Sequence, residues 1–218
     1  MTAKLALLEE YALIARALGS PHRMMLLEQL AQGERGVEAL ARKIGATVAN
    51  CSQHLQQLRR AGLVTSRRAG KAVIYRLTDD KTLVLMDLLG RIARQNLAVV
   101  NEILQDLTQG RAPEPITRAE LAARLDEGSV TLFDMRPEDE FAMGHIPGAL
   151  QVDPGRLDAV VATLTPSTEI VAYCRGPYCL YAHQAVARLR QLGLAARRLD
   201  GGLPEWRADG RPVVSDPA

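Results

Sequence analysis

The sequence predicts two domains of different fold class. A mostly helical α+β domain is expected over residues 1–109, and an α/β domain with a parallel sheet over residues 117–218, joined by a linker at residues 110–116. Three observations predict this arrangement. The first half combines helical spacing of apolar residues with one hairpin pattern, and the second half alternates apolar strands with helical segments. Between them, two prolines and a glycine interrupt the helical patterns from Gln109 to Ile116.

Composition favours a cytoplasmic protein with buried cores. The chain has 218 residues, of which 47% are hydrophobic, enough for two domain cores. It lacks a run of about 18 apolar residues that would span a membrane, and its amphipathic N-terminus does not have the pattern of a cleavable signal. Three cysteines do not make a disulfide framework in a reducing compartment, so each is expected to be a small buried side chain or a working thiol.

Charge is distributed unevenly along the chain. Residues 1–109 hold 15 Lys and Arg against 10 Asp and Glu, whereas residues 110–218 hold 12 against 15. From Arg42 to Arg76 there are eight basic residues and no acidic one. This asymmetry predicts a nucleic-acid face in the first half and a different task in the second.

Helices dominate the start of the first half. Apolar residues keep helical spacing from Leu5 to Leu18, and Gly19-Ser20-Pro21 ends that helix and starts another, which runs through Leu30. A short helix from Val37 to Ile44 is expected to close at Gly45.

A second short helix and a hairpin follow. Thr47 is expected to cap a helix that ends at Gly62, and two helices joined by a tight glycine-containing turn make a helix-turn-helix. Strand-forming residues at 63–66 and 72–77 flank an Arg-Arg-Ala-Gly-Lys tip, which together predict a wing. One long helix from about Asp79 to Gln109 is expected to complete the domain.

The stretch GATVANCSQHLQQLRRAGLVTSRRAGKAVIYRL, residues 45–77, resembles the core of the ArsR family of winged-helix repressors, and the resemblance covers roughly residues 8–105. It implies a homodimer formed through the first and last helices, a recognition helix in the major groove of double-stranded operator DNA, and a wing on the backbone or minor groove. It also implies contacts to bases and phosphates from Asn50, Ser52, Gln53, His54 and Gln57. Phosphate contacts, which position the protein without reading sequence, would come from Arg59, Arg60, Arg67, Arg68 and Lys71.

No metal site and no cofactor are expected. Metal-sensing members of that family place cysteines before the recognition helix, or His and Asp ligands on the last helix. Here the first place reads GVEALAR and the last helix has no histidine, so Asp87 and Glu102 alone do not offer the nitrogen or sulfur ligands that transition metals prefer. Cys51 lies on the apolar stripe of its helix, which favours buried packing over a sensor thiol.

The second half alternates helices and strands. Thr117 and Glu120 have the spacing of a capping box at the start of a helix. The expected strands are Val130–Met135, Glu169–Tyr173 and the segment AARRLDGG, and the expected helices are TRAELAARLDEG, Pro154–Leu164, HQAVARLRQLG and LPEWRADG. Strands separated by helices form a parallel sheet, whose functional sites gather at the carboxyl ends of the strands.

Cys174 stands at such a carboxyl end. A glycine- and proline-containing loop follows it, and a helix is expected just beyond Cys179. Backbone N–H groups of a loop before a helix, together with the helix dipole, favour an anion, so a thiolate there has a lowered pKa and is a nucleophile. Arg175 adds positive charge. The pattern therefore predicts a reactive thiol with a companion.

The second half also resembles the rhodanese-like sulfurtransferases, over about residues 115–214. The matching motifs are FDMRPEDEFAMGHIPGAL, the Tyr-Cys strand end and GGLPEW. The resemblance implies that Cys174 takes sulfane sulfur from a donor as a persulfide and passes it to a thiol acceptor. It implies that Asp134 and Arg136 support the loop. Many members have Arg, Thr or Ser where this chain has Cys179, which makes Cys179 a candidate resolving thiol.

Several functions compete at this stage. Two thiols and a distant His183 are too few for a metal clip or for arsenite, and a phosphatase variant of the fold needs an arginine where Leu180 stands. The favoured hypothesis is a dimeric DNA-binding regulator, a repressor, whose rhodanese-like domain senses or transfers sulfane sulfur. The alternative is a sulfurtransferase whose winged-helix half serves recruitment or dimerisation, and a thiol-based metalloid sensor is a lesser alternative.

Overall fold

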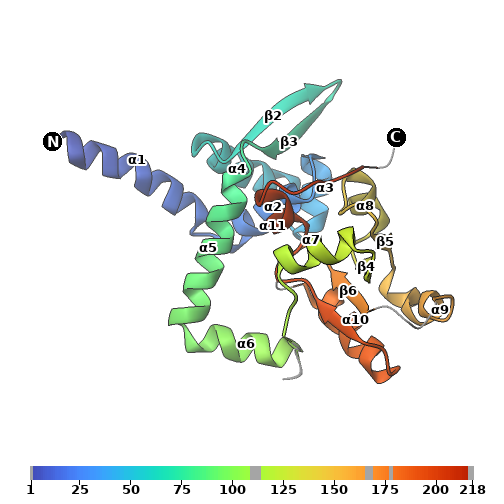
Figure 1. Cartoon of the computed structure of the whole chain (residues 1–218). Helices are drawn as coiled ribbons and strands as arrows, with labels where there is room; N and C mark the ends of the chain where they lie inside the picture. Colours follow the sequence, from blue (N-terminus) through green and yellow to red (C-terminus); the bar gives the residue numbers. More distant parts are fainter. Residues whose placement is uncertain (1, 109–113, 165–168, 177–178, 216–218) are drawn as a thin grey trace. The chain divides into compact units, whose positions relative to one another are not determined.

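The computed structural model describes residues 2–108, 114–164, 169–176 and 179–215 (Figure 1). Most of the predicted linker at residues 110–116 therefore lies outside the described residues. The chain divides into two compact units, Met1–Thr82 and Leu83–Ala218.

The first unit is a set of helices with a small antiparallel sheet. Its sheet has the strand order β1-β3-β2, and its helices bury leucines on one face each. The helices are α1 (Ala3–Leu18), α2 (Pro21–Ala31), α3 (Val37–Lys43) and α4 (Val48–Arg60), and the strands are β1 (Arg35–Gly36), β2 (Val64–Ala69) and β3 (Ala72–Leu77). The predicted helix-turn-helix and wing are confirmed as α3, α4 and the β2–β3 hairpin.

Local chemistry explains the turn between α3 and α4. Gly45 has a φ of 65°, a left-handed conformation that suits glycine, and α3 ends before it. The Thr47 hydroxyl accepts a hydrogen bond from the Asn50 amide at 3.2 Å, which confirms the predicted cap of α4.

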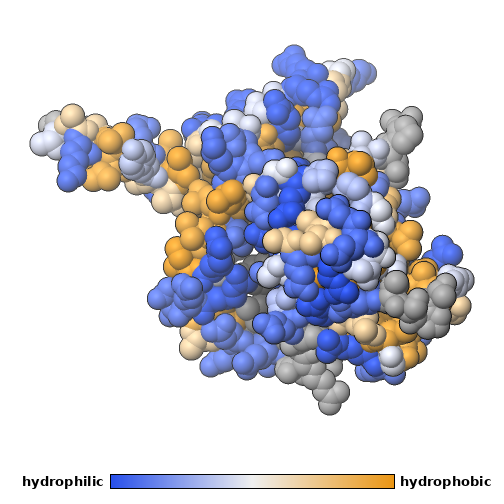
Figure 2. Space-filling view, in the orientation of Figure 1, coloured by the Kyte–Doolittle hydropathy of each residue, from blue (hydrophilic) through white to orange (hydrophobic). Residues whose placement is uncertain are grey.

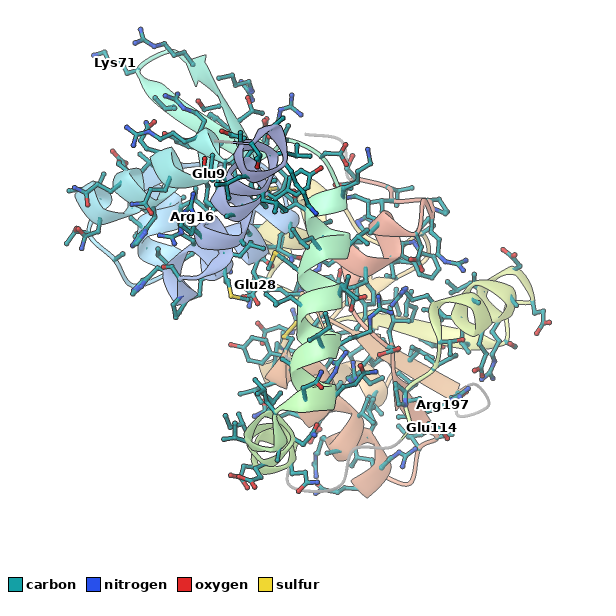
Figure 3. All side chains as sticks on the ribbon, turned by 90° about the vertical axis from the view of Figure 1, so that its left-hand side faces the viewer. Glu9, Arg16, Glu28, Lys71, Glu114 and Arg197 are labelled. Atoms are coloured by element: carbon teal, nitrogen blue, oxygen red, sulfur yellow. A yellow bond between two sulfur atoms is a disulfide. The ribbon has the colours of Figure 1, made fainter. Side chains whose placement is uncertain are left out.

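The hairpin tip is shorter than predicted. Strand β2 continues to Ala69, opposite Ala72, so Arg67 and Arg68 lie in the strand rather than in the tip. The turn needs only Gly70, with a φ of 60°, and Lys71 (Figure 3). Each residue of β2 from Val64 to Ala69 is paired with a residue of β3, so the two strands stay paired up to the turn.

The single long helix predicted after the wing is wrong. Two helices stand in its place, and Leu97 separates them. The Asn96 amide donates to the carbonyl of Ile92 at 2.8 Å, and the Asn101 amide donates to the carbonyl of Arg94 at 2.9 Å. Asparagine side chains that take over backbone partners favour helix ends, which explains the break. The two helices are α5 (Lys81–Asn96) and α6 (Ala98–Thr108).

The remainder of the second unit is built on a parallel four-stranded sheet of order β5-β4-β6-β7. Its strands are β4 (Val130–Asp134), β5 (Leu150–Gln151), β6 (Glu169–Tyr173) and β7 (Ala196–Arg198). Its helices are α7 (Arg118–Asp126), α8 (Glu138–Met143), the 3₁₀ turn η1 (Pro154–Arg156), α9 (Leu157–Val161), α10 (Leu180–Gln191) and α11 (Leu203–Ala208). The predicted parallel α/β fold is confirmed. Strand β5 was not predicted from the sequence.

Alternation along β6 divides the core into two layers. Ala172 and Cys174 pack with Val186 of α10, whereas Tyr173 packs with Trp206 on the opposite face. The register pairs Asp134 of β4 with Tyr173, so the carboxyl ends of the two central strands lie level. In the described part of the chain, no helix is both long and apolar enough to cross a membrane.

The capping box predicted at α7 forms only in part. The Thr117 hydroxyl accepts from the Glu120 amide at 3.1 Å, as expected. The Glu120 carboxylate pairs instead with Arg197 at 2.6 Å.

A buried ion pair lies at the carboxyl end of β4. The Arg136 guanidinium contacts the Asp134 carboxylate at 2.5 Å, and neither side chain has any exposed surface. Arg136 also donates to the carbonyl of Gly144 at 2.7 Å. Two charges removed from water remain favourable only when they are fully paired and hydrogen-bonded, so this pair constrains the strand end tightly.

Arg136→Met is expected to lower the free energy of unfolding of the second unit by about 3–5 kcal/mol, because it leaves a buried carboxylate without its counter-charge. Urea unfolding followed by the fluorescence of Trp206, the single tryptophan, measures this. The control is Arg188→Met, which removes an exposed pair with Asp158 and should have a far smaller effect. Similar losses in the two variants would contradict the role given to the buried pair.

Candidate functional site

The ten predicted DNA contacts all lie on α4 and on the β2–β3 hairpin of the first unit. All of them are exposed except Ser52 and His54, which are half-buried. The opposite face of α4 packs inward through Cys51, Leu55 and Leu58, which have no exposed surface. The amphipathic helix thus directs its polar side chains to solvent. That these side chains contact DNA stays a prediction.

Two of these side chains, Gln57 and Arg67, are hydrogen-bonded to side chains elsewhere in the first unit. Arg23 of α2 donates to the side-chain oxygen of Gln57, and it also donates to the carbonyl of Arg16 at 2.7 Å. Arg67 forms a two-point ion pair with Glu34, with its Nε at 3.3 Å from the carboxylate. Both partners are exposed, so Glu34 competes with any phosphate for Arg67.

His54 contacts another histidine. Its ring stacks on His22 with the ring centroids 5.4 Å apart. Burial, Arg23 and His22 lower the pKa of His54 below its ordinary value. His54 is therefore neutral near pH 7 and offers hydrogen bonds rather than charge.

Cys51 is confirmed as core packing. The side chain is fully buried, and burial raises the pKa of its thiol. A thiol in such a place is less nucleophilic than an exposed one.

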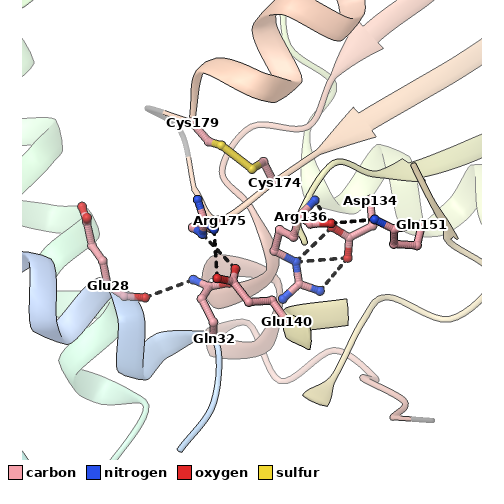
Figure 4. The surroundings of a disulfide bond; sticks show 9 residues. All are labelled: Glu28, Gln32, Asp134, Arg136, Glu140, Gln151, Cys174, Arg175 and Cys179. Atoms are coloured by element: carbon pink, nitrogen blue, oxygen red, sulfur yellow. Dashed lines mark hydrogen bonds and ion pairs between the residues drawn. A yellow bond between two sulfur atoms is a disulfide. The ribbon is translucent and has the colours of Figure 1, made fainter. Parts of the chain in front are cut away.

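The second site centres on Cys174, directly after β6. Cys174 has no exposed surface, and its sulfur is joined in a disulfide to Cys179, with the two Cα atoms 6.0 Å apart (Figure 4). Cys179 is the residue before α10, and its amide donates to the carbonyl of Gly176 at 3.2 Å. Pro177 and Tyr178 of the predicted loop lie outside the described residues.

Arg175 is turned to a partner on α8. Its guanidinium binds both oxygens of Glu140, at 2.8 and 2.9 Å, and Glu140 is fully buried (Figure 4). The charge expected to favour a thiolate is thus balanced by a carboxylate, and the pair fastens the loop to α8.

The Asp134–Arg136 pair contacts Tyr173, the last residue of β6 before the loop. The Arg136 guanidinium lies 5.8 Å from the centre of the Tyr173 ring, and the Tyr173 hydroxyl accepts from the Ile146 amide at 3.1 Å. Burial, followed by Asp134, raises the pKa of Tyr173 well above its usual range, so the hydroxyl keeps its proton. Tyr173 directly precedes Cys174.

The turn before α11 closes the loop from the other side. The Leu203 amide donates to the carbonyl of Cys174 at 3.2 Å. A Cβ on Gly202 would lie 2.3 Å from that carbonyl oxygen, so only glycine fits. The Glu205 carboxylate accepts from the Gly202 amide at 2.7 Å, and burial raises the pKa of Glu205.

These supporting residues were missed from the sequence. Glu140 is one of three consecutive acidic residues, and only its burial distinguishes it from its neighbours. Two consecutive glycines, Gly201 and Gly202, indicate in the sequence that another backbone segment passes close by, but they do not indicate that this segment is the one at Cys174. Within the described residues, no group of three or more His, Cys, Asp and Glu side chains is arranged to hold a metal ion.

Comparison with known proteins agrees with both halves of the fold. The chain is 42% identical over 210 residues to the HTH-type transcriptional regulator Rv0324 of Mycobacterium tuberculosis. The aligned residues are 96% of this chain and 92% of that protein. The chain belongs to the ArsR-type HTH transcriptional regulators with a C-terminal rhodanese-like domain. A helix-turn-helix domain family matches residues 18–67, and the rhodanese-like domain family matches residues 117–209.

Shorter relatives match the winged-helix part. The biofilm growth-associated repressor of Agrobacterium fabrum is 41% identical over 80 residues, which are 37% of this chain and 68% of that protein. The solution structure of the homodimeric winged helix-turn-helix DNA-binding domain Mb0332 of Mycobacterium bovis is 37% identical, covers 44% of this chain and 90% of its own, and has a TM-score of 0.42.

Gly202→Ala is expected to destabilise the rhodanese-like domain and to alter the alkylation rate of reduced Cys174 several-fold, since the added Cβ must displace the Cys174 backbone. Gly193→Ala is the control. Its Cβ meets no atom within 4 Å, so it carries only the cost of a φ of 81°, about 1–2 kcal/mol, and should leave alkylation unchanged. Mass-spectrometric alkylation kinetics measure the rate. If both variants alkylate like the wild type, the turn does not position Cys174.

Proposed function

We propose that this protein is a dimeric, cytoplasmic, DNA-binding repressor in which sulfane sulfur, held as a persulfide on Cys174, changes the affinity for operator DNA. The observation that carries the proposal is the presence, in one chain, of an exposed basic helix and wing and of a cysteine at the carboxyl end of a rhodanese-like β6. The sulfur comes from a sulfane-sulfur donor and leaves to a thiol acceptor.

Charge and exposure support operator binding. Arg59 and Arg60 end α4, and Arg68 and Lys71 extend along the hairpin, all exposed. Basic side chains on a helix and an adjacent wing match the pattern of phosphate contacts that position a recognition helix. The name of the Agrobacterium relative supports repression as the outcome.

Apolar exposure supports dimerisation. Helix α1 exposes Leu5, Leu8 and Tyr11, and α5 exposes Leu88 and Ile92. Figure 2 shows hydrophobic residues at the surface along both helices. Clusters of exposed apolar side chains of this kind usually mark an interface. In the proposed dimer each helix buries them against a second copy of the chain.

The support for Cys174 as the sulfur carrier is chemical. A thiolate is the nucleophile that attacks sulfane sulfur, and the N-terminus of the 12-residue helix α10 favours an anion beside it. We propose that Asp134, Arg136 and Arg175 act by holding the loop rather than by touching sulfur, since Arg136 pairs with Asp134 and Arg175 pairs with Glu140. Cys179 supplies a second thiol.

Replacing Arg67 and Arg68 together with alanine should weaken binding to every duplex and flatten the salt dependence, by about 0.9 in the logarithmic slope for each lost phosphate contact. Glu34→Gln should instead strengthen binding, because it releases Arg67. Fluorescence anisotropy at several salt concentrations measures both. Arg188→Ala, on the rhodanese-like domain, is the control. Unchanged affinity in the double variant would exclude the wing from the DNA interface.

A polysulfide donor should lower operator affinity by a factor of about 5–150, the range of typical coupling free energies of about 1–3 kcal/mol. The response should vanish in Cys174→Ser, weaken in Cys179→Ser and persist in Cys51→Ala, since Cys51 is core packing. Operator titrations with and without donor measure this.

Two results would contradict the proposal. Loss of the response in Cys51→Ala alone would place the sensing thiol in the recognition helix. Sulfur transfer through Cys174 with unchanged operator affinity would favour a sulfurtransferase enzyme whose winged-helix half serves recruitment.

A further inference from the structure

The two cysteine residues of the loop differ in exposure. Cys174 is fully buried and packs in the cluster with Met135, Ala172 and Ala182, whereas Cys179 is only half-buried before α10. Because thiol–disulfide exchange depends on which sulfur a thiolate can reach, we expect an external thiol to attack the sulfur of the more exposed residue, Cys179. The sulfur that leaves is then Cys174, the proposed nucleophile.

The third cysteine, Cys51, is free and fully buried, so we expect it to take no part in this chemistry. The Cys174–Cys179 pair is therefore a self-sufficient dithiol.

We propose that the Cys174–Cys179 pair makes the protein a dithiol-dependent sulfane-sulfur reductase that releases hydrosulfide. The inference rests on the proposed persulfide at Cys174 and extends it, since the family resemblance implies transfer of the sulfur rather than its reduction.

The reaction has three balanced steps. The Cys174 thiolate attacks the outer sulfur of a hydropersulfide, the donor's S–S bond breaks, and the donor leaves as a thiolate. The Cys179 thiolate then attacks the Cys174 Sγ; the disulfide forms, and the sulfane sulfur leaves with the electron pair as hydrosulfide, so the cysteines are oxidised by two electrons and the sulfane sulfur is reduced by two. Finally an external dithiol attacks the Cys179 sulfur, releases the Cys174 thiolate, and closes its own disulfide.

The structure corresponds to the state after the second step. In it Cys174 has no exposed surface, and the disulfide also occupies its sulfur, so no further sulfur is accepted until a dithiol opens the pair. Hydrosulfide release and sulfur loading therefore alternate.

Fully reduced protein is treated anaerobically with one equivalent of polysulfide, desalted into thiol-free buffer and followed by intact mass. The wild type and Cys51→Ala should lose the added sulfur at least about tenfold faster than Cys179→Ser, because the second thiol is held intramolecularly. They should end as the disulfide, lighter than the reduced chain by two hydrogens, with one hydrosulfide released per chain. Cys179→Ser should retain one added sulfur on Cys174.

The outcomes separate the two proposals. No sulfur on Cys174 in Cys179→Ser would overturn the proposed function itself. Loading of that variant together with a stable persulfide in the wild type would overturn only the reductase.

Regioselectivity gives an independent test. Oxidised protein is treated with limiting N-acetylcysteine and then with iodoacetamide. Peptide mapping should find N-acetylcysteine on Cys179 and the alkyl group on Cys174. The reverse assignment would overturn the order of steps.

Discussion

The ion pair between Arg136 and Asp134 is the interaction on which the loop that follows β6 depends. Both charges are fully removed from water, so the pair is stable only while its hydrogen bonds are complete. Those bonds fix the end of β4, and through Tyr173 they fix the end of β6. Cys174 follows immediately, and the Gly202 turn closes on its carbonyl. The Asp134–Arg136 ion pair at the end of β4 thus helps to set the position of the Cys174 sulfur at the end of the neighbouring strand β6.

Two arginines singled out from the sequence, Arg175 and Arg67, are each paired with a glutamate. Arg175 directly follows Cys174, and its guanidinium pairs with the buried Glu140, so this pair joins the loop to α8. Arg67 stands on the wing but binds Glu34 at the surface, where the pair is weak and phosphate can displace the carboxylate. The same pairing is therefore structural in one domain and exchangeable in the other, because burial differs.

The sequence predicted the elements better than their contacts. Apolar periodicity located α4, which has one buried face, and strand-forming residues located the hairpin. Short apolar runs located β4 and β6, whose ends are buried on both faces of the sheet. The sequence also placed Cys174 at a strand end and Cys51 in the core. It did not predict the break at Leu97, which depends on the side chains of Asn96 and Asn101 finding backbone carbonyls. Nor did it reveal Glu34 or Glu140, since ion pairs between segments distant in the sequence leave no periodic signal.

The central claim is that sulfur on Cys174 and DNA on the winged helix share one free energy of coupling. Linkage requires the effect to be reciprocal. The direct measurement is the fraction of Cys174 persulfide in Cys179→Ser at a fixed ratio of hydropersulfide to thiol, with saturating operator and with a scrambled duplex of equal length. The account predicts that operator lowers the persulfide-to-thiol ratio of Cys179→Ser by the same factor by which sulfur weakens operator binding in that variant. Equal ratios with the two duplexes would contradict it.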